Sequence, residues 1–191
     1  MKPTYLALGD SYTIGEGVKT EACWPVMLAS AMHWQAPTII AKTGWKTYDL
    51  LDALEHSKLE KQYDWVSLLI GVNNQYRSID FHTFREDLNQ LFQIVDALVN
   101  DSSHVVLVSI PDYSLTPYAQ DMDHMKISAE IEQYNLYIEA CATQKSYQFC
   151  DITDLSMRVG PDASMVVDDG LHPSALHYQL WVERLQDRCN F

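Results

Sequence analysis

The chain has 191 residues, with 13 Lys and Arg against 26 Asp and Glu, and therefore a formal net charge of −13. Hydrophobic residues make up 47% and charged residues 20%, a composition that excludes a disordered or fibrous protein. The negative charge disfavours nucleic acid and anionic membrane surfaces as partners, because like charges repel at long range. A chain of this length is typical of one domain, and we expect residues 1–191 to form it.

No segment approaches the roughly 18 consecutive apolar residues of a membrane-spanning helix, so we expect no integral membrane association. The start, Met1-Lys2-Pro3, leads directly into a strand-like run and does not resemble a secretory signal. We therefore expect a cytoplasmic location, or a periplasmic or secreted one if a leader preceded Met1. The four cysteines form no C-x-x-C pair, which disfavours a zinc site. We expect them to be reduced, and a Cys141–Cys150 bridge stays open.

Short apolar runs alternate with longer segments of helical periodicity along the whole chain. The runs predict strands over Tyr5–Leu8, Thr38–Ala41, Trp65–Ile70, Val105–Ile110 and Tyr147–Cys150. The periodic segments predict helices over Cys23–Gln35, Thr47–Lys61, Phe81–Asn100, Ile127–Lys145 and Ser174–Arg188. Thr47 and Ser174 stand where N-caps are expected. This alternation predicts a three-layer α/β/α sandwich, in which a five-stranded parallel sheet carries helices on both faces.

Residues with reactive side chains or flexible backbone follow three of the predicted strands. They form the segments Gly9-Asp10-Ser11, Thr43-Gly44-Trp45 and Gly71-Val72-Asn73-Asn74, and a fourth segment, Asp169-Gly170-Leu171-His172-Pro173, opens the last helix. Ligands of open parallel sheets bind beyond the carboxyl ends of the strands. We therefore expect these segments to meet at one edge of the sheet.

The residue types in these segments match the parts of a serine hydrolase. Ser11 is the candidate nucleophile and His172 its base, while Asp169, three residues before the histidine, would orient the imidazole. The N–H groups of Ser11 and Gly44 and the side-chain amide of Asn73 are candidate donors to a developing oxyanion. Each residue alone has a commonplace interpretation as a helix cap, a turn residue or a strand-end glycine. Their conjunction at one predicted edge favours a hydrolase.

Other residues compete for these roles. Asp168 is an alternative to Asp169, although the three-residue spacing to His172 favours the latter. His177 is expected on the following helix, and His124, in a loop-rich stretch, is an alternative candidate for lining the site. The pattern G-x-S-x-G is absent around Ser11, which disfavours the α/β-hydrolase fold, and no phosphate-binding loop or metal motif indicates a cofactor or a metal.

The four segments together resemble the four conserved blocks of the SGNH (GDSL) hydrolase family of lipases and esterases, and the resemblance extends along nearly the whole chain. It implies Ser11 as nucleophile, His172 as base and Asp169 as its partner, with an oxyanion hole from Ser11, Gly44 and Asn73. It also implies a flavodoxin-like fold, in agreement with the alternation of strands and helices.

The chain departs from the family pattern at three positions. Tyr12 stands where the short name of the family has Leu, and Asn74 replaces the Asp that usually follows the Asn of the third block. Lys42 lies two residues before Gly44, where an Asn is frequent. None of these changes affects the nucleophile, but Asn74 puts the support of its own loop in question.

The resulting hypothesis is a serine esterase that hydrolyses small, short-chain carboxylic esters through a covalent acyl-enzyme. An acyltransferase with the same triad, a thioesterase and a lysophospholipase remain alternatives. Aromatic and basic residues near the predicted crevice are candidates for substrate binding, although loops packing over the sheet edge would explain them equally well. These candidates are Tyr12, Trp45, Tyr76, Arg77 and Tyr113.

Overall fold

The computed structural model describes residues 1–191 and contains one sheet of five parallel strands. The strands are β1 (Tyr5–Gly9), β2 (Thr38–Ala41), β3 (Trp65–Leu69), β4 (Val105–Val108) and β5 (Gln148–Cys150). Their order in the sheet is β2-β1-β3-β4-β5, which is the order of flavodoxin-like folds. Every residue of β1, β3 and β4 is buried, as expected for strands covered on both faces.

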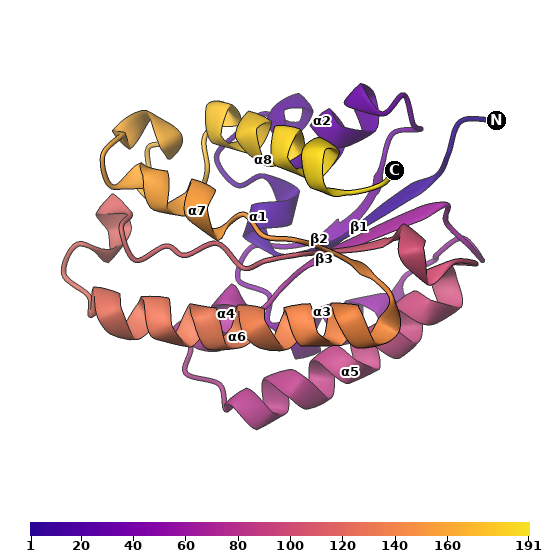
Figure 1. Ribbon diagram of the computed structural model, residues 1–191, viewed down its shortest axis with the longest axis horizontal. Coiled ribbons are helices and arrows are strands. Elements are labelled where there is room, and N and C mark those ends of the chain that lie inside the picture. The colour runs from indigo at the N-terminus through magenta and orange to yellow at the C-terminus, as the bar shows by residue number, and fades with distance from the viewer.

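Two layers of helices enclose the sheet, and Figure 1 shows one above and one below it. The upper layer contains α1 (Ser11–Ile14), α2 (Trp24–Ala31), α7 (Thr153–Ser156) and α8 (Ala175–Arg188). The lower layer contains α3 (Thr47–His56), α4 (Val72–Tyr76), α5 (Phe81–Leu98) and α6 (His124–Lys145). Short 3-10 helices η1 to η5 span Thr20–Ala22, Ser102–His104, Pro117–Ala119, Met157–Val159 and Ala163–Met165. The predicted three-layer fold is therefore confirmed.

The predicted helices are present, but several of their ends differ. The second helix of the prediction, Thr47–Lys61, ends at His56, where Ser57 turns to extended backbone and its hydroxyl donates to the Ala53 carbonyl. Lys46, not Thr47, is the N-cap of α3, so the prediction for Thr47 was wrong. Ser174 caps α8 as expected, accepting the His177 N–H.

The first predicted helix, Cys23–Gln35, also ends early. The backbone of His33 adopts a positive φ of 58°, which a continuing helix does not allow. The chain therefore leaves α2, and Trp34 packs on Trp65 in an aromatic cluster at the amino end of the sheet. Periodicity did not reveal the short helices α1, α4 and α7, because four or five residues are too few to show a helical repeat.

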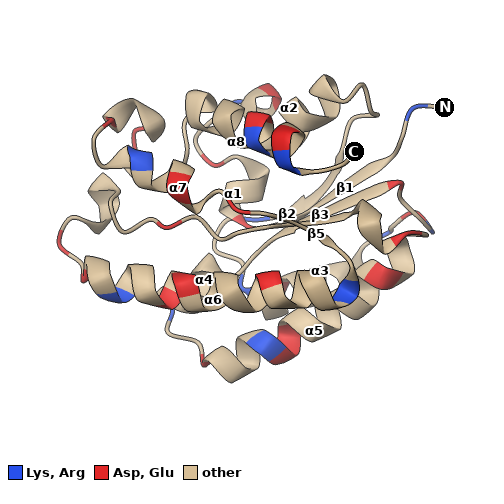
Figure 2. Ribbon diagram, in the orientation of Figure 1, with Lys and Arg blue, Asp and Glu red and all other residues tan.

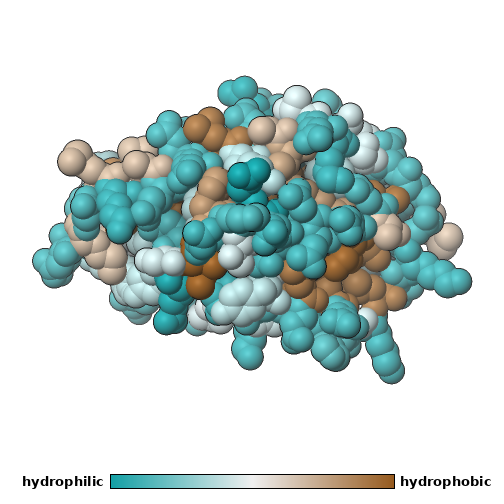
Figure 3. Space-filling view, turned by 90° about the horizontal axis from the view of Figure 1, so that it is seen from below, coloured by the Kyte–Doolittle hydropathy of each residue, from teal (hydrophilic) through white to brown (hydrophobic).

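The surface is predominantly acidic and polar. Acidic residues occur in both helical layers in Figure 2, and the face of the molecule seen in Figure 3 is mostly hydrophilic with small apolar areas. No helix in the structure combines the length and the hydrophobicity that crossing a membrane would require. All four cysteines are buried and unpaired.

Candidate active site

The predicted segments meet at the carboxyl edge of the sheet, on the left of Figure 1. A pocket of about 190 Å³ opens there, and its wall includes Ser11, Gly44, Asn73 and His172. Its other lining residues are Tyr12, Thr43, Val72, Tyr76, Arg77, Tyr113, Tyr118 and Leu171. The structure therefore brings together residues that lie up to 161 positions apart in the chain, from Ser11 to His172.

Ser11 lies at the point where β1 ends and α1 begins. The preceding residue, Asp10, caps this short helix, because its carboxylate accepts the Tyr12 N–H at 3.0 Å. The carbonyl of Asp10 accepts the N–H groups of Thr13 and Ile14. None of these bonds uses the Ser11 N–H, because the first amide of a helix has no partner within the helix. That N–H is consequently available to a ligand in the pocket.

The carboxyl group of Asp10, directly beside Ser11, is completely buried, and its Oδ2 atom has no hydrogen-bond partner. Burial raises the pKa of this carboxyl to about 7, although the Tyr12 N–H and the Asn73 side chain act in the opposite direction. The nucleophile candidate therefore follows a carboxyl group that ionises much less readily than an exposed aspartate.

Gly44 is in a tight turn that follows β2. The Trp45 N–H donates to the Lys42 carbonyl at 3.2 Å, and Gly44, the third residue of this turn, has a φ of 81°. That conformation favours glycine, and no atom lies within 4 Å of the place where a Cβ would be. The backbone of Gly44 thus faces open space in the pocket, where a ligand can approach it closely.

Asn73 also lines the pocket, from the first turn of α4. Its side-chain Nδ2 donates to the Trp45 carbonyl at 3.0 Å, which connects α4 to the turn that carries Gly44. An amide nitrogen has two hydrogens. The second one is the candidate donor to a ligand, and the same side chain also acts on the Asp10 carboxyl, whose pKa it lowers. Three N–H donors, from Ser11, Gly44 and Asn73, therefore occur around one small pocket.

Asp169 and His172 form a compact unit stabilised by hydrogen bonds within the segment. The Oδ1 atom of Asp169 accepts the N–H groups of Leu171 and His172 at 2.8 and 3.0 Å. Its Oδ2 atom lies 2.6 Å from Nδ1 of His172. Gly170, between them, has a φ of 72°, which permits this reversal of the chain.

The geometry of this hydrogen bond determines which nitrogen of the imidazole is free. Because a carboxylate accepts and does not donate, Nδ1 of His172 carries the hydrogen, and Nε2 remains to accept a proton. Burial acts to raise the pKa of Asp169, but the hydrogen bonds from the side chain and backbone of His172 and from Leu171 outweigh it, so that the pKa lies below its usual value. The carboxylate is therefore ionised near neutral pH.

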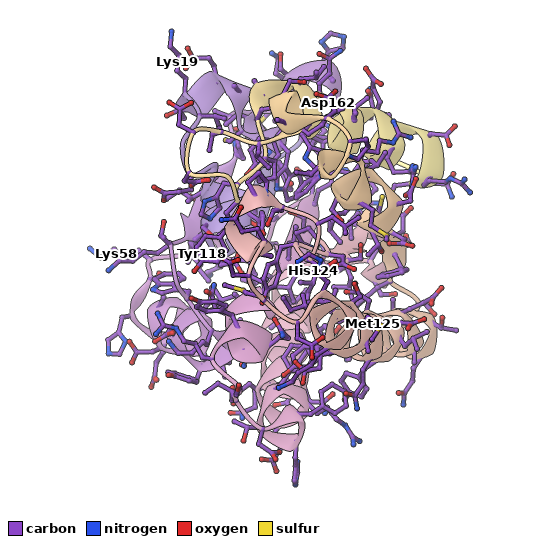
Figure 4. All side chains as sticks on the ribbon, turned by 90° about the vertical axis from the view of Figure 1, so that its left-hand side faces the viewer. Lys19, Lys58, Tyr118, His124, Met125 and Asp162 are labelled. Atoms are coloured by element: carbon purple, nitrogen blue, oxygen red, sulfur yellow. The ribbon has the colours of Figure 1, made fainter.

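Tyrosines form much of the remaining pocket wall. Tyr12 is almost completely buried, and its ring lies 5.5 Å from that of His172. The hydroxyl groups of Tyr76 and Tyr118 are hydrogen-bonded at 2.6 Å on the exposed rim, and the Arg77 guanidinium lies 5.6 Å from the Tyr76 ring. Figure 4 shows this end of the molecule, with Tyr118 between the two helical layers.

Four of the five predicted substrate-binding residues line the pocket, and Trp45 does not. Its side chain packs against the hydrophobic core, and only its carbonyl takes part in the site, through Asn73. His124 does not line the pocket either, since its Nε2 bonds to the Ala119 carbonyl. His177 is buried in α8, where its Nδ1 lies 3.1 Å from the Met165 carbonyl.

Thr43, Val72 and Leu171 also line the pocket, although the sequence did not single them out as site residues. Each is adjacent to a predicted site residue, which is the only signal that the sequence offered. The Thr43 hydroxyl in addition donates a hydrogen bond to the carboxylate of Glu16, which connects the Gly44 turn to the segment after α1.

Known structures share this fold over almost their full length. A member of the lipolytic G-D-S-L family from Veillonella parvula superimposes with a TM-score of 0.76 at 14% identity, covering 96% of each chain. An acetylxylan esterase from Geobacillus stearothermophilus gives a TM-score of 0.70 at 20% identity, covering 99% of this chain and 94% of its own. A comparison with curated proteins found no match.

The sequence itself also matches a family. Residues 7–180 match the GDSL-like Lipase/Acylhydrolase family, a range that includes all four predicted segments. The low identities to the solved structures establish the fold alone, whereas the family match covers most of the chain. The chain therefore belongs to the GDSL-like lipase/acylhydrolase family and is a hydrolase of the carboxylic ester type.

Proposed function

We propose that this protein hydrolyses short-chain carboxylic esters by two-step acyl transfer, with Ser11 as nucleophile, His172 as general base and Asp169 as the residue that orients the base. The observation that carries the proposal is the 2.6 Å contact between Asp169 and Nδ1 of His172, because His172 lines the same pocket as Ser11. Nucleophilic catalysis requires a serine and a base held in one tautomer within the same pocket.

In the first step, Nε2 of His172 takes the Ser11 hydroxyl proton while Oγ bonds to the ester carbonyl carbon. The carbonyl oxygen becomes an oxyanion and accepts hydrogen bonds from the N–H groups of Ser11 and Gly44 and from the Asn73 amide. Collapse breaks the bond to the alcohol, which leaves with the proton from His172. Water then attacks the acyl-enzyme, and the same proton transfers release the acid and restore Ser11.

The size of the pocket supports small substrates. A volume of about 190 Å³ lies below the range of roughly 300–1,000 Å³ that is common for drug-sized ligands. An acetyl or similarly short acyl group fits this space, whereas a long chain would extend past the exposed Tyr76 and Tyr118 at the rim. The likeness to an acetylxylan esterase makes acetylated sugars the first natural class to examine.

Hydrolysis of p-nitrophenyl esters from acetate to long chains tests the proposal directly. We expect acetate and butyrate to be cleaved, long chains to react poorly, and Ser11→Ala to abolish turnover. Equal activity of Ser11→Ala and the native protein would refute Ser11 as the nucleophile.

Products formed in the presence of added alcohols or sugars separate hydrolysis from acyl transfer. We expect the free acid to predominate, because water reaches an open pocket. Predominant transfer to the added hydroxyl would identify an acyltransferase with the same residues. Acyl thioesters and lysophospholipids, assayed beside the aryl esters, test the remaining alternatives.

A further inference from the structure

Three buried polar side chains form a continuous hydrogen-bonded chain next to Asn73, which lines the pocket. The Thr47 N–H donates to Oδ1 of Asn74 at 3.0 Å, and Nδ2 of Asn74 donates to Oγ1 of Thr47 at 2.8 Å. The Thr47 hydroxyl in turn donates to Oδ2 of Asp87 at 2.6 Å. Thr47 and Asn74 are fully buried and Asp87 is 9% exposed. None of the three lines the pocket.

These hydrogen bonds connect the segments that carry two of the candidate oxyanion donors. Thr47 is the first residue of α3 and follows the turn that contains Gly44, while Asn74 is adjacent to Asn73 in α4. The bond from Asn73 to the Trp45 carbonyl is a further connection between the same two segments. Asp87 belongs to the long helix α5 and supplies a rigid attachment for both.

The turn around Gly44 needs such an attachment. Nothing packs against the open side of Gly44, and Lys42 and Thr43 are partly or largely exposed. An oxyanion donor must lie about 2.7–3.1 Å from the oxygen it stabilises. A misplacement of about 1 Å can lower the rate on the order of 100-fold.

We propose that Asn74, Thr47 and Asp87 are positioning residues, which hold the Gly44 N–H and the Asn73 amide at the correct separation across the pocket. The inference rests on the proposed function, because it assigns these two groups to the oxyanion. It also accounts for the departure at position 74, where the family pattern has Asp. The amide of Asn74 supports this loop because it both donates and accepts a hydrogen bond.

The direction of each hydrogen bond makes the chain specific for an amide at position 74. Thr47 has one hydroxyl hydrogen, and Asp87 receives it, so Oγ1 of Thr47 is left as an acceptor toward position 74. In Asn74→Asp a carboxylate oxygen would face that acceptor, and two carboxylates would compete for one hydrogen in a buried place.

Exchanging the amide and the carboxylate should restore the chain with its direction reversed. In the double variant Asn74→Asp/Asp87→Asn, the aspartate at position 74 accepts both the N–H and the O–H of Thr47. The new amide at position 87 then donates to Oγ1 of Thr47. We therefore expect Asn74→Asp to lower kcat on p-nitrophenyl acetate about 10- to 100-fold with KM changed less than about threefold, and the double variant to recover most of the loss.

Asn135→Asp is the matched control for the cost of a buried aspartate. Asn135 is 9% exposed and, like Asn74, makes two hydrogen bonds to a single residue: it accepts the Ile110 N–H and donates to the Ile110 carbonyl. It belongs to α6 and makes no bond to the Gly44 turn. We expect Asn135→Asp to lower the thermal midpoint as Asn74→Asp does, without the loss of kcat per folded molecule.

Hydrogen exchange provides a readout that does not depend on activity. Backbone amides of residues 43–47 should exchange faster in Asn74→Asp than in the native protein and return toward native rates in the double variant. If Asn74→Asp does not fold, Thr47→Val and Thr47→Ser replace it. We expect the valine, which lacks the hydroxyl, to lose kcat and the serine to keep it.

Three results would overturn the proposal: native kcat in Asn74→Asp, an equal loss of kcat in Asn135→Asp, or no recovery in a folded double variant. Failure of the proposed function has a different signature, because native protein and Ser11→Ala would then hydrolyse the ester equally or not at all. In that case the hydrogen-exchange rates of residues 43–47 still decide whether the hydrogen bonds among Asn74, Thr47 and Asp87 hold the Gly44 turn.

Discussion

The two ends of the parallel sheet are built on opposite principles. At the amino end, aromatic rings close the fold: Trp34 and Trp65 are stacked at 5.4 Å, and the Phe191 ring meets both edge-on at 5.2 and 5.0 Å. At the carboxyl end there is a pocket, a glycine facing open space, and a buried carboxyl oxygen of Asp10 without a partner. The first end supplies stability, and the second sacrifices stability for accessible donors and a reactive serine.

The largest expected effect comes from the amino end. Replacing Trp65 with Ala empties the centre of the aromatic cluster, so we expect the free energy of unfolding to fall by about 3–5 kcal/mol. Because the cluster is at the far edge of the sheet, kcat per folded molecule should stay close to native. Chemical denaturation with an ester assay measures both quantities, and Trp65→Phe, which keeps a ring, should lose less stability. A drop in kcat as large as that expected for a variant of the pocket, such as Asn73→Ala, would show that the amino end also contributes to catalysis.

Asn73→Ala should have the converse effect at the carboxyl end. Removing this candidate oxyanion donor is expected to lower kcat by about 10²–10³, as for other acyl-transfer enzymes. The unfolding free energy should change much less, because within the protein the variant loses only the bond to the Trp45 carbonyl and the interaction of the Asn73 side chain with the Asp10 carboxyl. Steady-state kinetics and denaturation decide the case, and an unchanged kcat would remove Asn73 from the oxyanion hole.

The buried carboxyl group of Asp10, next to Ser11, is expected to lower the stability of the folded protein when it ionises. Its pKa is raised to about 7, so the folded protein binds this proton more tightly than the unfolded chain, where the pKa is about 4. Stability is therefore lost as the pH rises between these values. Asp10→Asn keeps the cap on the Tyr12 N–H but cannot ionise.

We expect Asp10→Asn to gain about 1–3 kcal/mol over the native protein at pH 8 and little near pH 4, as measured by denaturation across this range. Comparing the two proteins at each pH removes the contribution of other titrating groups, among them His177, whose pKa is lowered by burial. A difference that does not depend on pH would show that ionisation of Asp10 carries no cost.

The smallest effect is expected at the exposed rim. Tyr118→Phe removes the hydrogen bond to the Tyr76 hydroxyl but leaves the ring in place. Exposed hydrogen bonds contribute little, so we expect KM for short esters to change no more than two- to threefold and kcat to stay near native. A large fall in kcat would instead place the Tyr118 hydroxyl among the groups that act on the reacting ester.

The predictable part of this molecule is the part that depends on local repetition. Continuous apolar runs such as Trp65–Leu69 indicated buried parallel strands, and the apolar stripe of α5 indicated a helix packed on the sheet. The short helices α1 and α4, which place Ser11 and Asn73, have no repeat to read. Ser11 and Asn73 were predicted as site residues only because they follow predicted strands. The short helices that hold them were not predicted.

The sequence by itself determined the layered α/β fold, the four segments at one edge of the sheet and the family to which the chain belongs. Those features depend on periodicity and on short motifs, which are local. Only the tertiary structure decided that Trp45 packs inward, that Asp10 is buried without a full set of partners, and that Asn74, Thr47 and Asp87 form one hydrogen-bonded chain. These outcomes depend on which side chains from distant elements meet, because burial and hydrogen-bond direction arise from packing and leave no pattern in the sequence.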